Sequence, residues 1–429
     1  MKLNYKKTFL VGLAFMSISA FWQLYDNVIP LMLKDTFGVK ETARGIIMAL
    51  DNVLALFLLP FFGSLSDKSR SKFGKRIPFI LLGTVLSFTF MIFIPYADNT
   101  VNFVLFLITL GGVLLSMGIY RSPAVALMPD VTPKALRSSG NAVINLMGAL
   151  GAVFTLAMTM FLVPKGDSPD YSALFITVAA FMLVSVLIMS FTVKENRERE
   201  AAEEYDRLHP SPIDETKALS ESVGKRLPPE VFRSLIFILL AVAAWYMAYN
   251  AVTTAFSSYV SEVWGLEGGG YASCLMVATV AAVISYIPVG IISSKVGRKK
   301  VIYAGVILMA VAYAAGMIAN EYGAWVNIVF AAVGIGWAAI NVNSYPMVVE
   351  MASGGDIGKY TGLYYTFSMA AQILTPIASG ALLEHVSYRT LFPYATVFMI
   401  LAFILMIFVR HGDNKNVSAD ASAFDISDM

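Results

Sequence analysis

The sequence has few of the residues on which soluble enzymes base their chemistry. A single cysteine, Cys274, stands within an apolar run, so the chain has no cysteine pair for an internal disulfide or a metal site. The three histidines (His209, His385 and His411) lie far apart, which argues against a histidine metal site or a catalytic triad. No phosphate-binding loop, Gly-x-Ser-x-Gly or His-Glu-x-x-His pattern is found. We therefore expect that the protein is not an enzyme and that it binds no metal and no other cofactor.

Charged residues are also scarce. They make up 14% of the 429 residues, against about a quarter in soluble proteins, whereas hydrophobic residues make up 57%. Such a chain cannot cover its apolar surface with polar groups in water, so we expect an integral membrane protein. Nucleic-acid binding is not expected, because no basic domain or base-stacking platform stands outside the apolar runs.

Apolar runs long enough to cross a bilayer recur along the chain. A spanning helix needs about 20 mostly apolar residues. Twelve such runs are present, at residues 8–33, 44–65, 77–96, 101–128, 140–163, 171–193, 233–260, 270–293, 301–319, 323–349, 359–383 and 389–409. The prediction is an all-α membrane protein whose twelve transmembrane helices form two six-helix pseudo-repeat halves.

Polar segments divide the chain further. A charged, proline-containing stretch separates the sixth and seventh runs, and the chain is polar after His411. We therefore predict an N-terminal half at 1–193, a cytoplasmic linker of helix and loop at 194–232, a C-terminal half at 233–410 and a disordered cytoplasmic tail at 411–429.

The distribution of cations predicts the orientation in the membrane. If the amino terminus is cytoplasmic, most of the 31 Lys and Arg residues fall in segments on that side. The opposite segments then hold only Lys34, Lys40, Arg44, Lys165 and Arg389. Because short cytoplasmic loops are enriched in Lys and Arg, we predict a multi-pass protein of the cell (plasma or inner) membrane with both termini in the cytoplasm.

Two predicted cytoplasmic loops have similar sequences. FFGSLSDKSRSKFGKRIPFI starts at Phe61, between spans two and three, and PVGIISSKVGRKK starts at Pro288, between spans eight and nine. The plain interpretation of their cations is a topology anchor. The alternative is a latch, because Asp67 at the end of span two can accept hydrogen bonds from the amides and cations of a neighbouring helix. Matching loops also indicate a parallel internal repeat, as in some transporters.

Under the latch hypothesis we predict the following gating residues: Gly63, Asp67, Arg70, Gly74, Lys75, Arg76, Asn141, Gly290, Gly297, Arg298 and Glu350.

These loops carry a resemblance to a known family. The pattern Gly63-Ser-Leu-Ser-Asp67 with Gly74-Lys75-Arg76 resembles the loop motif of the major facilitator superfamily. SKFGKRIPFI, residues 71–80, resembles the signature of sucrose:proton symporters, which belong with the glycoside–pentoside–hexuronide:cation symporters. The stretch YRSPAVALMPDVTPKALRSSGNAVINLMGALGA from Tyr120 is similar to the fourth and fifth spans of sucrose transporters. The resemblance implies alternating access, with a substrate site near the midplane between the halves.

Ionisable and polar residues within the spans are candidate functional residues, since a charged group there costs at least about 2.5 kcal/mol. Trp22, Gln23 and Asp26 share one helical face, with Asn27 beside it. An aromatic ring beside amide and carboxylate groups suits a sugar, whose C–H faces pack on the ring while its hydroxyls pair with the polar groups. The structural alternative is a set of interhelical hydrogen bonds.

Arg121 is the most informative of these residues because it always keeps its charge. It must pair with a carboxylate, for which Asp26 and Asp51 are candidates, or line a wet cavity, and it can offer forked donors to hydroxyls. The second half carries mid-span amides and aromatic residues, which fit a neutral, hydroxyl-rich substrate. The predicted substrate-binding residues are Trp22, Gln23, Asp26, Asn27, Arg121, Tyr249, Asn250, Trp337, Asn341, Tyr364 and Gln372.

The resemblance also bears on coupling. The resemblance to melibiose permease implies a cation- and sugar-binding carboxylate at the position that Arg121 occupies here, and two further carboxylates of that family would fall on Ala55 and Leu59. This chain lacks that sodium site, so proton coupling is favoured over sodium coupling. The predicted proton-coupling residues are Asp26, Asp51, Asp130 and Arg137. The structural alternative to proton coupling is helix packing for Asp51 and a latch for Asp130 and Arg137.

Together these features predict a secondary active transporter, functional as a monomer, for proton-coupled symport of a sugar such as sucrose or maltose. A buried carboxylate would load and release the proton near neutral pH. Two other classes stay open: an exporter of drugs or organic ions from the same superfamily, and a non-transporting receptor or scaffold.

Overall fold

The computed structural model describes residues 4–133, 136–164, 169–208, 228–266, 268–351 and 357–413, and all regular elements within these ranges are helices. The long helices are α1 (Tyr5–Asp35), α2 (Glu41–Asp67), α3 (Ile77–Asn99), α4 (Phe103–Val131), α5 (Arg137–Leu162), α6 (Ser172–Thr192), α7 (Glu195–Leu208), α9 (Pro229–Trp264), α10 (Ala272–Val296), α11 (Arg298–Met317), α12 (Trp325–Glu350), α13 (Ile357–His385) and α14 (Leu391–Ile407). Two short 3₁₀ turns, η2 (Gly268–Tyr271) and η3 (Tyr388–Thr390), complete the set.

The predicted membrane spans are confirmed. Within the described residues, 12 helices are long and apolar enough to cross a bilayer, and each overlaps one predicted run. Several helices extend beyond their runs, and α9 reaches 36 residues, whereas α6 and α14 lie within theirs. The helix expected in the linker is α7, whose 14 residues are mostly charged. Many large apolar side chains remain exposed, among them Phe161 at 80% and Phe191 at 83%, as expected where lipid covers the protein.

Contacts between helices divide the chain into two compact units. Unit 1 contains α1 to α7 together with three later segments: the end of α9 from Thr253, η2 with the start of α10 up to Met276, and the end of α13 from Pro376. Unit 2 contains α9 up to Val252, the rest of α10 and α13, and the helices α11, α12 and α14. We describe each unit by itself.

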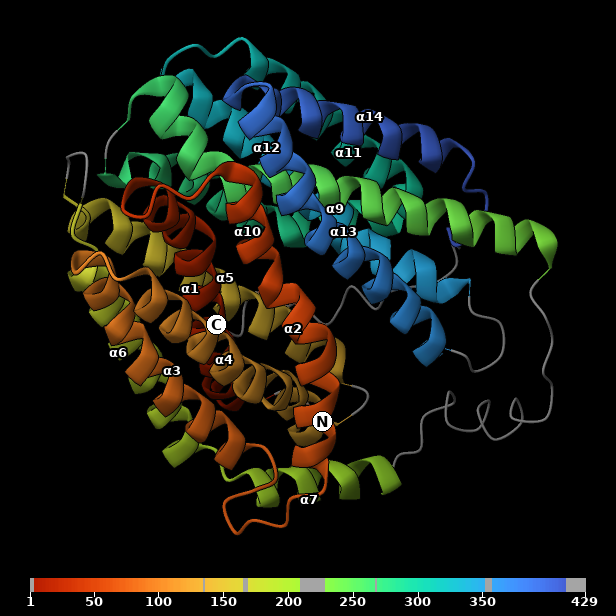
Figure 1. The fold of residues 1–429 in the computed structure, drawn as a ribbon. Coiled ribbons are helices and arrows are strands. Elements are labelled where there is room, and N and C mark those ends of the chain that lie inside the picture. The colour runs from red at the N-terminus through yellow and green to blue at the C-terminus, as the bar shows by residue number, and fades with distance from the viewer. Residues whose placement is uncertain are drawn as a thin grey trace. The chain divides into compact units, whose positions relative to one another are not determined.

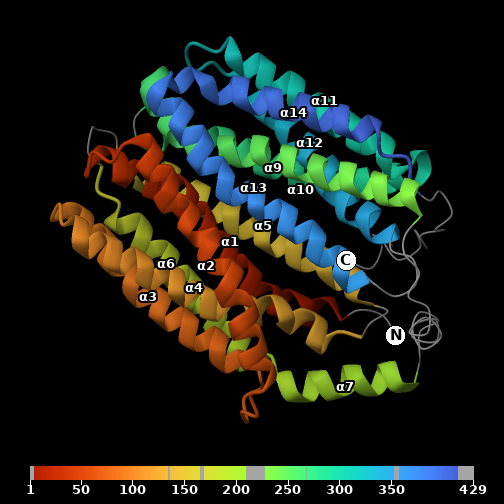
Figure 2. The same cartoon turned by 45° about the vertical axis from the view of Figure 1, so that its right-hand side comes forward.

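Each unit has its own packing core. In unit 1, α1 packs against α5 and α6, while α3 packs against α4 and α6 (Figures 1 and 2). In unit 2, α11 packs against α12 and α14. Side chains cap some of these helices: Asn4 accepts from the Lys7 N–H at 3.1 Å to begin α1, and Asn102 accepts from the Leu105 N–H at 3.0 Å to begin α4. The order and packing of the helices therefore determine which polar side chains lie next to one another.

Candidate functional site

The first group of functional candidates lies in unit 1, where α1, α2 and α4 bring their charged residues together. Asp26 of α1 interacts electrostatically with Asp51 of α2 and with Arg121 of α4, and Asp51 also interacts with Arg121. All three side chains are half-buried. Ionisable groups at membrane depth face a bundle interior or a wet cavity rather than lipid. The three residues therefore form one charged cluster, with two carboxylates to one guanidinium.

An aromatic ring lies directly beside this cluster. The guanidinium carbon of Arg121 is 5.3 Å from the centroid of the Trp22 ring, within the range of a cation–π contact. Edge-to-face contacts with Phe21 at 5.0 Å and Tyr25 at 5.4 Å fix the indole. The buried Trp22 Nε1 has no hydrogen-bond partner among the described residues. A ring face, a buried N–H donor and charged groups thus converge, as in binding sites for small polar molecules.

The amides around the cluster divide into two kinds. Asn52 donates to Asp51 Oδ1 at 2.7 Å and so orients that carboxylate. Gln23 is half-buried on the same helix as Trp22. Asn27 is only 2% exposed and donates to the Gln23 carbonyl at 2.8 Å within α1, whereas its buried Oδ1 has no hydrogen-bond partner among the described residues. Asn52 was not among the predicted site residues, because no pattern distinguishes an amide that orients a carboxylate.

Unit 2 contains an aromatic group built from α9, α12 and α13. Trp337 stacks on Tyr249 with ring centroids 3.8 Å apart and planes at 4°, and Tyr246 meets the Trp337 ring edge-on at 5.3 Å. Tyr246 is hydrogen-bonded to Tyr364, which is 2.9 Å from Ser344 Oγ. The predicted residues Tyr249, Trp337 and Tyr364 therefore belong to one connected platform. Tyr246, three residues before Tyr249, was not among the predicted site residues.

The remaining predicted residues of unit 2 are less central. Asn250 donates to the Tyr246 carbonyl at 2.9 Å and Gln372 to the Ser368 carbonyl at 3.2 Å, each within its own helix. Asn341 is exposed and hydrogen-bonded to Tyr286. Each of these three amide side chains therefore already makes a hydrogen bond within the protein.

The first charged loop forms a network centred on Arg76, a residue only 4% exposed. Its guanidinium donates to Asp130 Oδ2 at 2.8 Å, to Asp67 Oδ1 and to Ser66 Oγ. Lys75 lies 3.1 Å from the same oxygen of Asp130. The end of α2, the start of α3 and the end of α4 are thereby held together, which favours the latch role for Asp130.

A linker residue completes this network. The carboxylate of Glu195, the first residue of α7, accepts from the backbone N–H groups of Lys75, Arg76 and Ile77 at 2.8 to 3.0 Å. These are the free amides at the start of α3, where a negative charge is favourable. Asp67 therefore binds the Arg76 side chain, and Glu195 binds the amides. Glu195 was missed because the charged linker indicated a solvated helix.

The second charged loop repeats this arrangement within unit 2. Arg298 at the start of α11 pairs with Glu350 at the end of α12, as Arg76 at the start of α3 pairs with Asp130 in α4. Asp413 accepts from the Arg298 backbone N–H at 2.7 Å, in the role of Glu195. Both loops contain a glycine with positive φ at this point, +113° at Gly74 and +99° at Gly297. The internal repeat predicted from the loops therefore extends to their contacts.

The other predicted gating and coupling residues lie away from these networks. Arg70 and Asn141 are exposed, and a side chain at Gly290 would meet open space. Gly63 lies against Ser122, since a Cβ there would be 2.8 Å from Ser122 Oγ. Arg137 begins α5, and its side chain lies outside the described parts of the structure. Residues 414–429 of the predicted tail are likewise outside them.

In the described part of the chain, twelve helices are long and apolar enough to span a membrane, and two charged loops match; these are features of a membrane transporter rather than an enzyme. The sequence profile of the Major Facilitator Superfamily matches residues 11–285 and 238–426. The chain therefore belongs to the Major Facilitator Superfamily.

Three relatives are similar to this chain in sequence. An uncharacterised transporter of the superfamily from Methanocaldococcus jannaschii is 24% identical over 94% of this chain and 95% of its own length. A sucrose transport protein of Arabidopsis thaliana is 26% identical over 31% of this chain and 25% of its own length. The isoprimeverose transporter of Lactiplantibacillus pentosus is 23% identical over 41% of this chain and 38% of its own length.

Solved structures show the same fold at low identity. The inward-open xylose transporter of E. coli has a TM-score of 0.67 at 14% identity, with 96% of this chain and 97% of that chain covered. A nucleoside transporter has a TM-score of 0.68 at 12% identity, with 94% of this chain and 100% of that chain covered. Neighbours with such different substrates support the fold alone.

Proposed function

We propose that this protein is a proton-coupled symporter of a neutral sugar of two or more units, working by alternating access with both termini in the cytoplasm. One observation carries the proposal: Trp22 lies against Arg121, which interacts with Asp26 and Asp51. This set combines a ring face for sugar C–H groups with forked donors and acceptors for hydroxyls. Unit 2 has a ring platform of its own, in which Trp337 stacks on Tyr249.

The charge of the cluster supports coupling to a proton. With Asp26 and Asp51 ionised and Arg121 protonated, the three residues carry one net negative charge, which one bound proton cancels. An uncharged sugar then leaves the loaded cluster neutral, whereas an anionic substrate would give it a net negative charge. We assign the proton to Asp26, since Asp51 already accepts a hydrogen bond from Asn52. No resident metal or cofactor is needed.

The paired loops supply the cytoplasmic latches of this proposal. Arg76 with Asp67 and Asp130, and Arg298 with Glu350, each hold helix ends together within one unit. Charge-assisted hydrogen bonds of this kind are strong enough to favour one state and still separate in water. The sucrose and isoprimeverose transporters among the relatives support a sugar substrate, although they match only part of the chain.

The test is transport into vesicles that contain the purified protein and a pH-sensitive dye. Sucrose, maltose, melibiose, lactose and monosaccharides are added outside, one at a time, with and without sodium. Acidification inside with one sugar, independent of sodium, is the expected result. Sugar uptake that requires sodium and moves no proton would overturn the coupling. Proton movement driven only by drugs or organic ions would replace the proposal with an exporter.

A further inference from the structure

The end of α3 carries a buried carboxyl group that the proposed mechanism does not use. Asp98, in the last turn of this helix, is 4% exposed, and its Oδ1 has no hydrogen-bond partner among the described residues. The Thr36 side chain, just after α1, is hydrogen-bonded to Asp98. No cation pairs with Asp98 in the described part of the chain. Because a buried carboxylate without a paired cation is costly, the neutral form of this group is favoured.

Two further carboxylates lie close to Asp98. Asp35 at the end of α1 and Asp170 just before α6 both interact electrostatically with it, and α6 packs against both α1 and α3. Hydrogen bonds from the Ser172 hydroxyl and backbone N–H lower the pKa of the Asp170 carboxyl below its ordinary value. Asp170 is therefore stabilised as an anion, and its charge opposes a second anion at Asp98.

The cations near this end of unit 1 are bound to other carboxylates. Lys34 Nζ lies 3.5 Å from Asp35 Oδ1 and 2.5 Å from Glu262 Oε1 at the end of α9. One ammonium group is thus shared between two carboxylates. An ionised Asp98 would add to this excess of negative charge.

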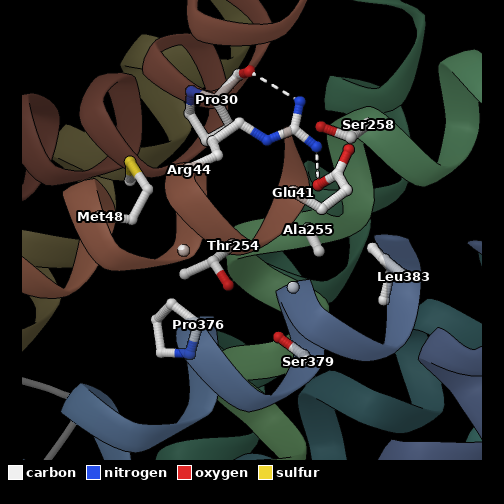
Figure 3. A pocket seen from close by; sticks show the side chains of 12 residues that line it. Pro30, Glu41, Arg44, Met48, Thr254, Ala255, Ser258, Pro376, Ser379 and Leu383 are labelled. Carbon is white, nitrogen blue, oxygen red and sulfur yellow. Dashed lines mark hydrogen bonds and ion pairs between the residues drawn. The ribbon is translucent and has the colours of Figure 1, made fainter. Parts of the chain in front are cut away.

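Arg44 of α2 is likewise committed elsewhere. It interacts electrostatically with Asp35. Its guanidinium, however, pairs with Glu41 and donates to the Pro30 carbonyl at 3.3 Å, as Figure 3 shows. Glu41 therefore balances the charge of Arg44.

Two buried tyrosines complete the surroundings of Asp98. Tyr171 interacts electrostatically with Asp98, with Asp35 and with Tyr271, the last residue of η2. Tyr271 is 3% exposed, and its hydroxyl has no hydrogen-bond partner among the described residues. Asp98 Oδ1 and the Tyr271 hydroxyl are thus two buried polar groups without partners around one tyrosine. Because buried polar groups are nearly always hydrogen-bonded, this pair indicates a place where the protein takes up a small polar species.

The backbone holds Asp98 in this environment. Directly after it the chain reverses, with the Val101 N–H donating to the Asp98 carbonyl and the Asn102 N–H to the Ala97 carbonyl, each at 2.9 Å. The φ of Val101 is +50°, a value that β-branched residues rarely adopt. The surrounding turn enforces this strained conformation, so the end of α3 is fixed and the buried carboxyl group stays among its neighbours.

We propose that Asp98 is a second proton-binding site, at the outer end of unit 1 and separate from the charged cluster of α1, α2 and α4. The proton forms an O–H bond on the Asp98 carboxylate and cancels its charge. Repulsion from Asp35 and Asp170 then disappears, and the ends of α1, α3 and α6 are held together. Asp35 stands nine residues beyond Asp26 of the cluster, about 14 Å along α1 at 1.5 Å per residue. The inference uses the proposed orientation, but neither the substrate nor the coupling.

The first test follows the melting temperature of the purified full-length protein between about pH 5 and about pH 8. The folded protein binds this proton more tightly than the unfolded chain does, so its contribution to stability is present at low pH and is lost as the pH rises. Asp98→Asn is neutral throughout. We expect its melting temperature to match that of the unaltered protein at the acid end and to exceed it by about 2 to 4 °C at the alkaline end.

Glu321→Gln is the matched control, because it removes an exposed carboxylate between α11 and α12. It should keep the pH dependence of the unaltered protein. A difference between Asp98→Asn and the unaltered protein that does not vary with pH would overturn the proposal.

Infrared difference spectra identify the group that takes up the proton. On acidification we expect a C=O stretching band of a protonated carboxyl group that is missing in Asp98→Asn and present in Asp26→Asn. Asp170→Asn removes a like charge and should move the midpoint of this band to lower pH. Thr36→Val removes a hydrogen bond to the carboxylate and should move it to higher pH. These two variants test the proposal even if Asp98→Asn fails to fold, and midpoints that do not move would overturn it.

Neither measurement needs a substrate, so a failure of this proposal is distinguishable from a failure of the proposed function. In transport assays, Asp98→Asn should leave the number of protons moved per sugar unchanged. Loss of proton movement with sugar uptake intact in this variant would place Asp98 in the transport path and overturn its separation from the charged cluster.

Discussion

Glu195 occupies the space that a side chain at position 74 would need. A Cβ on Gly74 would lie 2.0 Å from Glu195 Oε2, and the φ of Gly74, +113°, is one that glycine adopts most readily. Glycine at this position therefore lets the carboxylate reach the three amides at the start of α3. Arg76, the third of the loop's Gly-Lys-Arg residues, is in turn held by Glu195 at its backbone and by Asp130 at its side chain.

Neutralising Glu195 should therefore weaken the cytoplasmic latch. Glu195→Gln replaces charge-assisted hydrogen bonds with neutral ones at a buried site, which should cost about 1.5 to 3 kcal/mol. We expect a lower melting temperature of the purified protein and slower sugar uptake. The matched control is Glu200→Gln, at an exposed position of the same helix, which should change neither. Equal melting temperatures for both variants would contradict the capping role.

Asp130→Asn distinguishes a latch from a proton carrier. Asp130 contacts Arg76 and Lys75, so its loss should slow the cycle by weakening the latched state. It should leave the number of protons moved per sugar unchanged. The measurement compares initial uptake rates with the steady-state sugar gradient at a fixed pH difference. Loss of the gradient with normal exchange would return Asp130 to the proton path.

Sequence patterns predicted the helices better than they predicted the partners. A spanning helix is recognisable from a local apolar run, and the runs at 8–33 and 171–193 became α1 and α6. The contacts of Glu195 depend on the end of α6 returning to the start of α3, more than a hundred residues away in sequence. No local pattern carries that information, so Glu195 resembled any other acid of a solvated linker.

For the candidate site, too, the sequence indicated single residues but not the contacts between them. Trp22, Asp26 and Arg121 stood out because polar groups inside apolar runs are costly. The stacking of Tyr249 on Trp337 was not predictable, since it depends on how α9 and α12 pack.

Asp26→Asn should uncouple sugar from protons. The amide cannot take up the proton that cancels the charge of the cluster, but it keeps the shape of the side chain. We expect sugar exchange across the membrane to continue while uphill accumulation and internal acidification are lost. Asp51→Asn is the comparison, because Asp51 shares the electrostatic interactions of the cluster. Accumulation that persists in Asp26→Asn and disappears in Asp51→Asn would move the proton to Asp51.

Trp22 should act through both its ring face and its N–H group. Trp22→Ala removes the surface on which Arg121 and a sugar would pack, so the KM for the sugar should rise about tenfold. Trp22→Phe keeps a ring but lacks the Nε1–H donor, which has no partner in the described protein, so a smaller rise is expected. Trp325→Ala, at a residue 41% exposed, should leave the KM unchanged. The KM values come from initial rates of labelled-sugar uptake, after quantitative blotting shows equal amounts of each variant in the vesicles. If Trp22→Phe raises the KM as much as Trp22→Ala, the hydrogen bond rather than the ring face dominates sugar binding. If neither variant changes the KM, Trp22 lies outside the sugar site. The proposed function then loses the observation that carries it.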